Sequence, residues 1–160
     1  MTTEHHATAA EHAEAWYRKQ AMTTDPEQIG CVRRSVTAFM RYCGWGQLTG
    51  RAVLCVTEML TNVRRHADSD ECTLLVHCSP SGVRIVVSDD SRDLPVLREP
   101  DPLSEGGRGM FLLSHTADAW GATPTATGKD VWVEFRAASG EGPAGAARTG
   151  TAPPLRPRTR

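Results

Sequence analysis

The stretch that decides the fold is VTEMLTNVRRHADSDE, residues 56–71. Apolar residues recur there and just before it at helical spacing, and they predict the core stripe of a helix: Val53, Val56, Leu60 and Val63. Three polar residues, Glu58, Asn62 and His66, recur every fourth position roughly opposite that stripe. Any amphipathic helix carries polar residues there, but asparagine is a mediocre helix former, so its amide is informative.

Start and stop signals mark an earlier helix. Asp25 can cap it, Pro26 suits the first helical position, and Gln28 completes the spacing of a capping box. Gly44 and Gly46 end its apolar periodicity. We therefore expect two helices in succession, the second running from residue 48 to about residue 67.

Strand patterns flank these helices. The predicted strands are an edge strand within residues 15–23, a hairpin of 72–78 and 83–89, and a last strand over 130–135. A Pro- and Gly-rich loop over residues 90–109 leads into a third helix, expected from about residue 108 to residue 117. This order predicts an α+β protein, a two-layer α/β sandwich with helices on one face of a mixed, mainly antiparallel sheet.

Composition limits the organisation and the class of partner. A chain of 160 residues is most simply one domain, expected over residues 14–136 between a flexible extension (1–13) and a disordered tail (137–160) rich in Gly, Ala, Pro, Thr and Arg. Eighteen basic against 19 acidic residues argue against direct nucleic-acid binding. No apolar run approaches the roughly 20 residues that span a bilayer, and no signal peptide is evident. We expect a cytoplasmic protein that does not contact the membrane.

The cysteines and histidines point to no metal centre. Five cysteines are scattered along the chain without a C-x-x-C pair, at positions 31, 43, 55, 72 and 78. The six histidines are not clustered, apart from His5 and His6. Reduced and mostly buried thiols are therefore expected, and the spacing of a zinc site is missing.

Two further motifs have both a functional and an ordinary interpretation. In VSDDSRDLP, residues 87–95, Asp89 ends a strand, where a carboxylate can accept the exocyclic amine of a purine. In EGGRGMFLL, residues 105–113, three glycines open a helix, where backbone N–H groups and the helix dipole suit an anion. Taken alone, the first motif is better interpreted as a polar turn after a strand. The glycine cluster alone is weak evidence, because flexible lids contain glycines routinely.

In combination, the three motifs resemble the Bergerat ATP-binding fold of the GHKL ATPase/kinase superfamily, which includes gyrase and histidine kinases. The RHA that follows the asparagine and the ending WG…GKDVWVEF look most like the small anti-sigma-factor serine kinases of actinobacterial type, over roughly residues 14–136. The resemblance implies an ATP- and Mg²⁺-dependent serine/threonine kinase. Such a kinase binds a sigma factor and phosphorylates an anti-anti-sigma (STAS-type) antagonist in a partner-switching system that regulates transcription. A homodimer is one possibility, and the sequence does not determine the oligomeric state.

The resemblance also implies roles for residues. Asn62 matches the Mg²⁺-binding asparagine, Glu58 the catalytic glutamate that orients or deprotonates the attacking hydroxyl, and Asp89 the adenine-reading aspartate. The other residues expected at the nucleotide are Arg65, His66, Ser91, Gly106, Gly107, Arg108 and Gly109.

Some positions depart from the family pattern. The family's Asp-x-Gly-x-Gly has Ser91 and Asp93 in place of its glycines here, and Asp130 stands where a threonine is common. Ser91 still lets adenine approach, whereas Asp93 and Asp130 place negative charge near the cofactor. They favour the alternative of an inactive or weakly active nucleotide-binding interaction module. A sensor histidine kinase is disfavoured, because no phosphoacceptor helix pair fits before residue 14.

Overall fold

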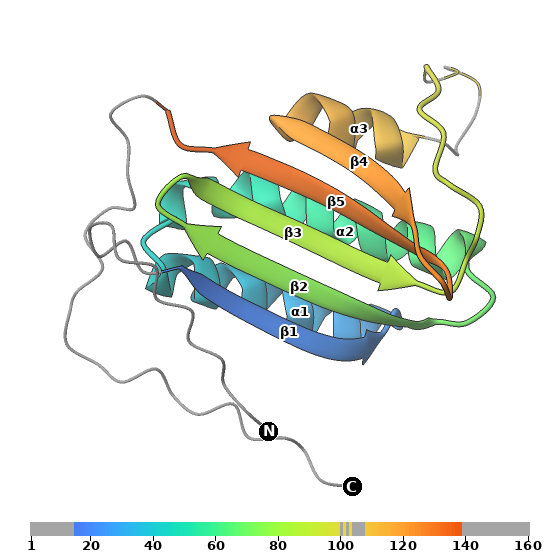
Figure 1. Ribbon diagram of the computed structural model, residues 1–160, viewed down its shortest axis with the longest axis horizontal. Helices are drawn as coiled ribbons and strands as arrows, with labels where there is room; N and C mark the ends of the chain where they lie inside the picture. The colour runs from blue at the N-terminus through green and yellow to red at the C-terminus, as the bar shows by residue number, and fades with distance from the viewer. Residues whose placement is uncertain (1–14, 100, 102, 104–107, 139–160) are drawn as a thin grey trace, which may run out of the picture.

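A computed structural model describes residues 15–99, 101, 103 and 108–138 (Figure 1). The elements in chain order are β1 (Trp16–Thr23), α1 (Pro26–Tyr42), a 3₁₀ turn (Gly46–Leu48), α2 (Thr49–His66), β2 (Glu71–Ser79), β3 (Gly82–Asp89), α3 (Arg108–Thr116), β4 (Ala119–Pro124) and β5 (Lys129–Arg136). The predicted extension over 1–13 and nearly all of the predicted tail lie outside the described residues, as do Gly106 and Gly107.

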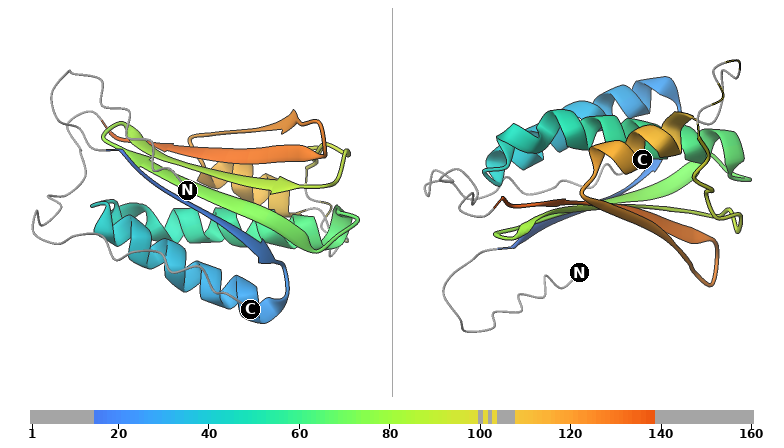
Figure 2. Two further views of the ribbon diagram at one scale, coloured as in Figure 1. Left: turned by 60° about the horizontal axis from the view of Figure 1, so that its bottom comes forward. Right: turned by 90° about the horizontal axis from the view of Figure 1, so that it is seen from above.

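The strands form one five-stranded sheet in the order β1-β2-β3-β5-β4. All neighbouring strands are antiparallel, so the sheet is not mixed. The three α-helices cover one face of this sheet and leave the other uncovered (Figure 2). The predicted α+β class and two-layer sandwich are confirmed. β4 was not predicted, because its sequence AWGATP lacks strand alternation and it pairs only with β5, at the sheet edge.

The ends of α1 follow from local chemistry. The Asp25 carboxylate accepts a hydrogen bond from the backbone N–H of Gln28 at 3.0 Å, which satisfies one of the unpaired donors of the first turn. Pro26 occupies the first helical position. Beyond the helix Gly44 takes a φ of 83°, a left-handed conformation that glycine adopts without a steric penalty. The predicted start and stop of this helix are confirmed.

The buried face of α2 differs from the predicted stripe. Val53 is only partly buried, and the side chains that fill the core are Ala52, Cys55, Val56, Met59, Leu60 and Val63. This face is rotated toward the polar stripe, because α2 packs against α1, α3 and the sheet at once. Asn62 therefore lies at the edge of the buried face instead of opposite it.

The C-terminal end of α3 is fixed to α2 and β5. The Arg51 guanidinium donates to the Thr116 carbonyl at 2.7 and 3.0 Å and to Asp118 Oδ1 at 2.8 Å. The other oxygen of Asp118 accepts from the backbone N–H of Arg136 at 2.6 Å. Burial alone would raise the pKa of Asp118, but these hydrogen bonds outweigh it and the pKa is lowered. The carboxylate is therefore held ionised as part of this anchor.

The cysteines agree with the expectation of free and mostly buried thiols. Cys31 is exposed, and the other four are buried. Burial raises the pKa of Cys55 to about 12 and that of Cys72 to about 11, so both remain neutral thiols at physiological pH. Among the described residues, no cluster of three or more His, Cys, Asp or Glu side chains is arranged to hold a metal ion.

Candidate functional site

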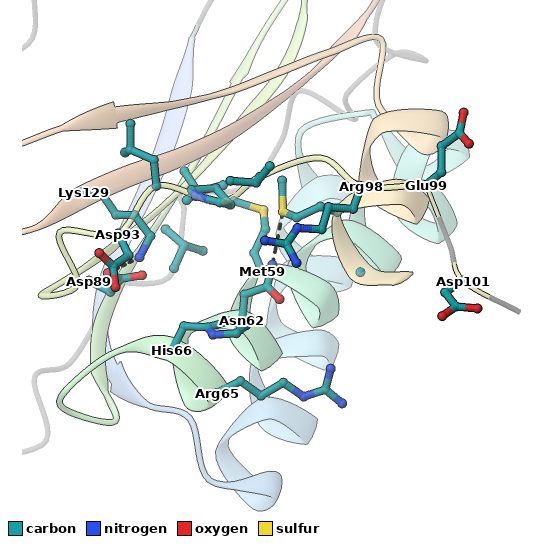
Figure 3. Close-up of a pocket in the computed structure, with 17 residues that line it drawn as sticks. Met59, Asn62, Arg65, His66, Asp89, Asp93, Arg98, Glu99, Asp101 and Lys129 are labelled. Carbon is teal, nitrogen blue, oxygen red and sulfur yellow. Dashed lines mark hydrogen bonds and ion pairs between the residues drawn. The ribbon is translucent and has the colours of Figure 1, made fainter. Parts of the chain in front are cut away.

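A cavity of about 600 Å³ lies between α2, the ends of β3 and β5, the loop after β3, and the start of α3. This size is typical of small-ligand sites. Figure 3 shows the lining side chains, which come from segments far apart in the sequence. The two ends of the cavity differ in chemistry, and an apolar wall lies between them.

The first end holds a buried ion pair. Asp89 is the last residue of β3, and its Oδ1 accepts from Lys129 Nζ at 2.9 Å and from the backbone N–H of Ser91 at 2.8 Å. The two charged side chains are only 3% and 6% exposed. In the β3–β5 ladder Asp89 and Lys129 are direct partners, so strand pairing positions both. Among the described residues, no hydrogen bond to Asp89 Oδ2 is present, so this oxygen can accept a ligand donor.

Ser91 shapes this end indirectly. It is buried and does not line the cavity; its N–H holds Asp89 and its Oγ accepts from the backbone N–H of Asp93 at 3.2 Å. Two successive side-chain-to-backbone turns thus lead the chain away from β3. Asp93 is exposed at the cavity wall, near Asp89 and Lys129 (Figure 3).

The middle of the cavity is apolar. Its lining consists of Met59, Val87, Leu94, Pro95, Val96, Met110 and Val131. These side chains come from α2, β3, the following loop, α3 and β5. A flat apolar group, such as an aromatic ring system, is the kind of ligand that such a wall accommodates.

The second end is polar and carries charges of both signs, since Glu99 and Asp101 line the cavity on the same side as Arg98 (Figure 3). Asn62 Nδ2 donates to Met110 Sδ at 3.2 Å, while no hydrogen bond to Asn62 Oδ1 occurs within the described part of the chain. Arg65, His66 and Arg98 also line the cavity, and Figure 3 shows the Arg98 side chain pointing back toward Asn62. α3 begins beside Asn62, so the partial positive charge of its N-terminus adds to that of the arginines. The arginines, Asn62 and the start of α3 are the groups at this end that could contact an anion.

Glu58 does not line the cavity. A Cβ added to Gly109 would lie 2.7 Å from Glu58 Oε2 and 3.6 Å from Asn62 Oδ1, so the first turn of α3 packs directly on the polar stripe of α2. Glu58 is therefore one helical turn from Asn62 and beneath α3. Arg108 is exposed and is also absent from the lining.

The structure thus brings together five of the predicted site residues at one cavity: Asn62, Arg65, His66, Asp89 and Gly109. Glu58, Ser91 and Arg108 lie beside it without lining it, and Gly106 and Gly107 lie outside the described residues.

Four charged lining residues were missed, and one expected charge is misplaced. The missed residues are Arg98, Glu99, Asp101 and Lys129. Arg98 lies on a loop without periodicity, so no sequence pattern marked it. Asp130 does not face the cavity: Val131, Val133 and Phe135 point to the core, and strand alternation turns Asp130 to the uncovered face and Lys129 inward. The residue opposite Asp89 is therefore a cation, and the expected repulsion by Asp130 is wrong. The same alternation, applied to the sequence, would have identified Lys129.

Comparison with known proteins agrees with this arrangement. A family model described as Histidine kinase-like ATPase domain matches residues 22–135, which include all the elements from α1 to β4 and nearly all of β5. No curated protein matches the chain. None of the described helices has the length and apolar character needed to cross a bilayer. The family match covers most of the chain and supports ATP binding at a GHKL-type site. The chain belongs to the histidine kinase-like ATPase family.

Proposed function

We propose that the protein is an ATP-binding serine/threonine kinase of the anti-sigma-factor type. One observation carries the nucleotide site: within the matched domain, a single cavity has a buried carboxylate at one end and an asparagine with two arginines at the other. The finer role rests on the resemblance of RHA and GKDVWVEF to that branch. Its partners would be a sigma factor and a STAS-type antagonist, and no nucleic acid or membrane is required.

The chemistry of the two ends supports one direction for the nucleotide. The purine would lie against the apolar wall with its amine at Asp89 Oδ2, and the phosphates would lie near Asn62, Arg65 and Arg98. Asn62 Oδ1 is a hard oxygen ligand that points into this end without a hydrogen bond from the described residues, so it fits Mg²⁺. Magnesium, when bound, would neutralise the charge of the phosphates during transfer.

Transfer requires Glu58 to reach the attacking hydroxyl. Its carboxylate now lies against Gly109, so the first turn of α3 has to shift before a serine or threonine can approach it. The Arg51–Asp118 anchor holds only the far end of α3, which allows such a shift of the near end. Glu58 would then accept the hydroxyl proton as the oxygen attacks the γ-phosphorus and ADP leaves.

A second candidate is an interaction module that binds nucleotide without transferring phosphate. The position of Glu58 beneath α3 and the negative Asp93 at the cavity wall favour it. Both candidates need ATP binding, and only the kinase needs Glu58 to become accessible. Phosphate transfer from Mg·ATP to a protein hydroxyl therefore separates them.

Removing the proposed Mg²⁺ ligand is the first test. Asn62→Ala should reduce the increase in ATP affinity that Mg²⁺ produces in the parent protein, because it removes the proposed amide ligand while leaving the carboxylates of Glu99 and Asp101 in the cavity lining. Calorimetric titrations with ATP, with and without Mg²⁺, measure this. Arg64→Ala is the matched control, since Arg64 is exposed on the same helix and does not line the cavity. An undiminished Mg²⁺ effect in Asn62→Ala would remove Asn62 from the metal site.

The contact between α3 and the polar stripe gives a second test. Gly109→Val should lower ATP affinity about tenfold or more, because the added side chain lies beside Asn62, where the phosphates are proposed to bind. Thermal unfolding should stay cooperative, because the added carbons meet the end of a flexible side chain and not the core. Gly50→Ala is the control: a Cβ there meets nothing within 4 Å, and nucleotide affinity should not change. Unchanged ATP affinity in Gly109→Val would mean that the start of α3 does not approach the phosphates.

A further inference from the structure

Lys129 occupies an unusual place for a lysine. Its ammonium is almost fully buried, lies on the core side of β5, and lines the cavity beside Asp89. Strand pairing fixes this position, since Asp89 and Lys129 are partners in the β3–β5 ladder. The cation therefore stands at the base end of the proposed nucleotide site, far from the arginines at the phosphate end (Figure 3).

The hydrogen-bonding capacity of this pair is only partly used. An ammonium has three N–H donors, and one of them reaches Asp89 Oδ1. No other hydrogen bond from Lys129 Nζ occurs among the described residues, and Asp89 Oδ2 is likewise without one. The pair thus presents to the cavity one strong donor and, next to it, one strong acceptor. Both side chains are almost fully buried, where hydrogen bonds to charged groups are strong.

We propose that Lys129 is a base-specificity residue that donates a hydrogen bond to N1 of adenine while Asp89 Oδ2 accepts from the adjacent N6 amine. This rests on the proposed binding of ATP in the cavity. Adenine presents a donor and an acceptor side by side on its Watson–Crick edge, which is the complement of what the pair offers. The base is thereby read by two protein charges of opposite sign, which form an ion pair with each other.

Guanine fits the same pair less well. Its Watson–Crick edge presents one acceptor, O6, followed by two donors, at N1 and N2. Asp89 Oδ1 already accepts from Ser91 and Lys129, so only Oδ2 remains for these two donors. Guanine would have to turn so that O6 meets Lys129 and both of its donors share the single oxygen Oδ2, whereas adenine pairs each of its two groups with a partner of its own. The geometry therefore favours adenine.

The test uses the unaltered protein and ATP analogues that lack single nitrogens. Replacing N1 by carbon, in 1-deaza-ATP, should weaken binding about tenfold or more, the scale of a hydrogen bond to a charged group. Replacing N7, in 7-deaza-ATP, is the matched control and should change affinity little. Equal affinities for ATP and 1-deaza-ATP would overturn the role of Lys129 while leaving ATP binding intact. No binding of ATP at all would overturn both this role and the proposed function.

A variant completes the argument. Lys129→Met should bind ATP as weakly as the parent binds 1-deaza-ATP and should no longer distinguish the two nucleotides. Because this change leaves the buried Asp89 without its cation, Asp89→Asn/Lys129→Gln supplies a neutral pair whose folding is easier to preserve. That double variant should also lose the distinction between the two analogues. A lasting preference for ATP over 1-deaza-ATP in a folded double variant would show that N1 is read by another group.

Discussion

Glu58→Gln should lower the rate of phosphate transfer about 10²–10⁴-fold, the usual contribution of a general base, and leave ATP affinity nearly unchanged. Glutamine has the same shape but cannot accept the hydroxyl proton. Glu58 does not line the cavity, so the nucleotide loses no contact. The measurement is single-turnover loss of the γ-phosphate from Mg·ATP, to water and to a purified STAS-type protein, beside an equilibrium titration with ATP.

The control for this variant is Glu71→Gln, which removes a charge from an exposed position at the start of β2. It should leave both the rate and the affinity unaltered. If Glu58→Gln retains the parent rate, Glu58 is not the base. If neither the parent nor the variant transfers phosphate while both bind ATP, the interaction module replaces the kinase as the function of this domain.

Gly128→Ala should destabilise the fold by about 3 kcal/mol, the upper end of the range for overpacking a tight site. A Cβ on Gly128 would lie 1.8 Å from the Asp89 carbonyl oxygen and 2.7 Å from Asp90 Cα. Both are backbone atoms, which cannot rotate aside as a side chain would. The strand after Gly128 would therefore have to move away from β3, and Lys129 would move away from Asp89 with it.

Urea unfolding followed by circular dichroism measures the loss of stability, and an ATP titration of the folded variant measures the loss of the site. Gly30→Ala is the control, because a Cβ there lies 3.8 Å from its nearest neighbour, the end of the Arg34 side chain. It should not destabilise the protein. A Gly128→Ala protein as stable as the parent would mean that the turn before β5 relaxes easily.

Local chemistry made part of the fold predictable. The cap at Asp25 and the proline after it act within one helical turn, so the start of α1 could be predicted from the sequence. The exact core face of α2 was not, because α3 packs on the side of the helix that carries Glu58 and Asn62. β4 was missed for a related reason: its residues gain strand structure from pairing with β5.

Site residues could be predicted where the residue type is uncommon at that position of a helix or strand. Asn62 stood out as an amide in a helix of better helix formers, and Asp89 as a carboxylate at a strand end. Lys129 and Arg98 did not stand out, since lysine and arginine are common at strand ends and in loops. Strand alternation would have turned Lys129 inward, and the pairing of β3 with β5 then shows that it is buried against Asp89.

Lys129 faces the core and Asp130 faces the uncovered side of the sheet. This alternation limits how the sequences of related domains can diverge at the start of β5. One missing residue between β4 and β5 would slide Asp130 into the place opposite Asp89 and turn the three core residues of β5 to the uncovered face. Selection should therefore tolerate substitutions in the turn over residues 125–127 far better than insertions or deletions there. By the same reasoning, an alignment of relatives that is wrong by one position here would invert the sign of the charge assigned to the base end of the site.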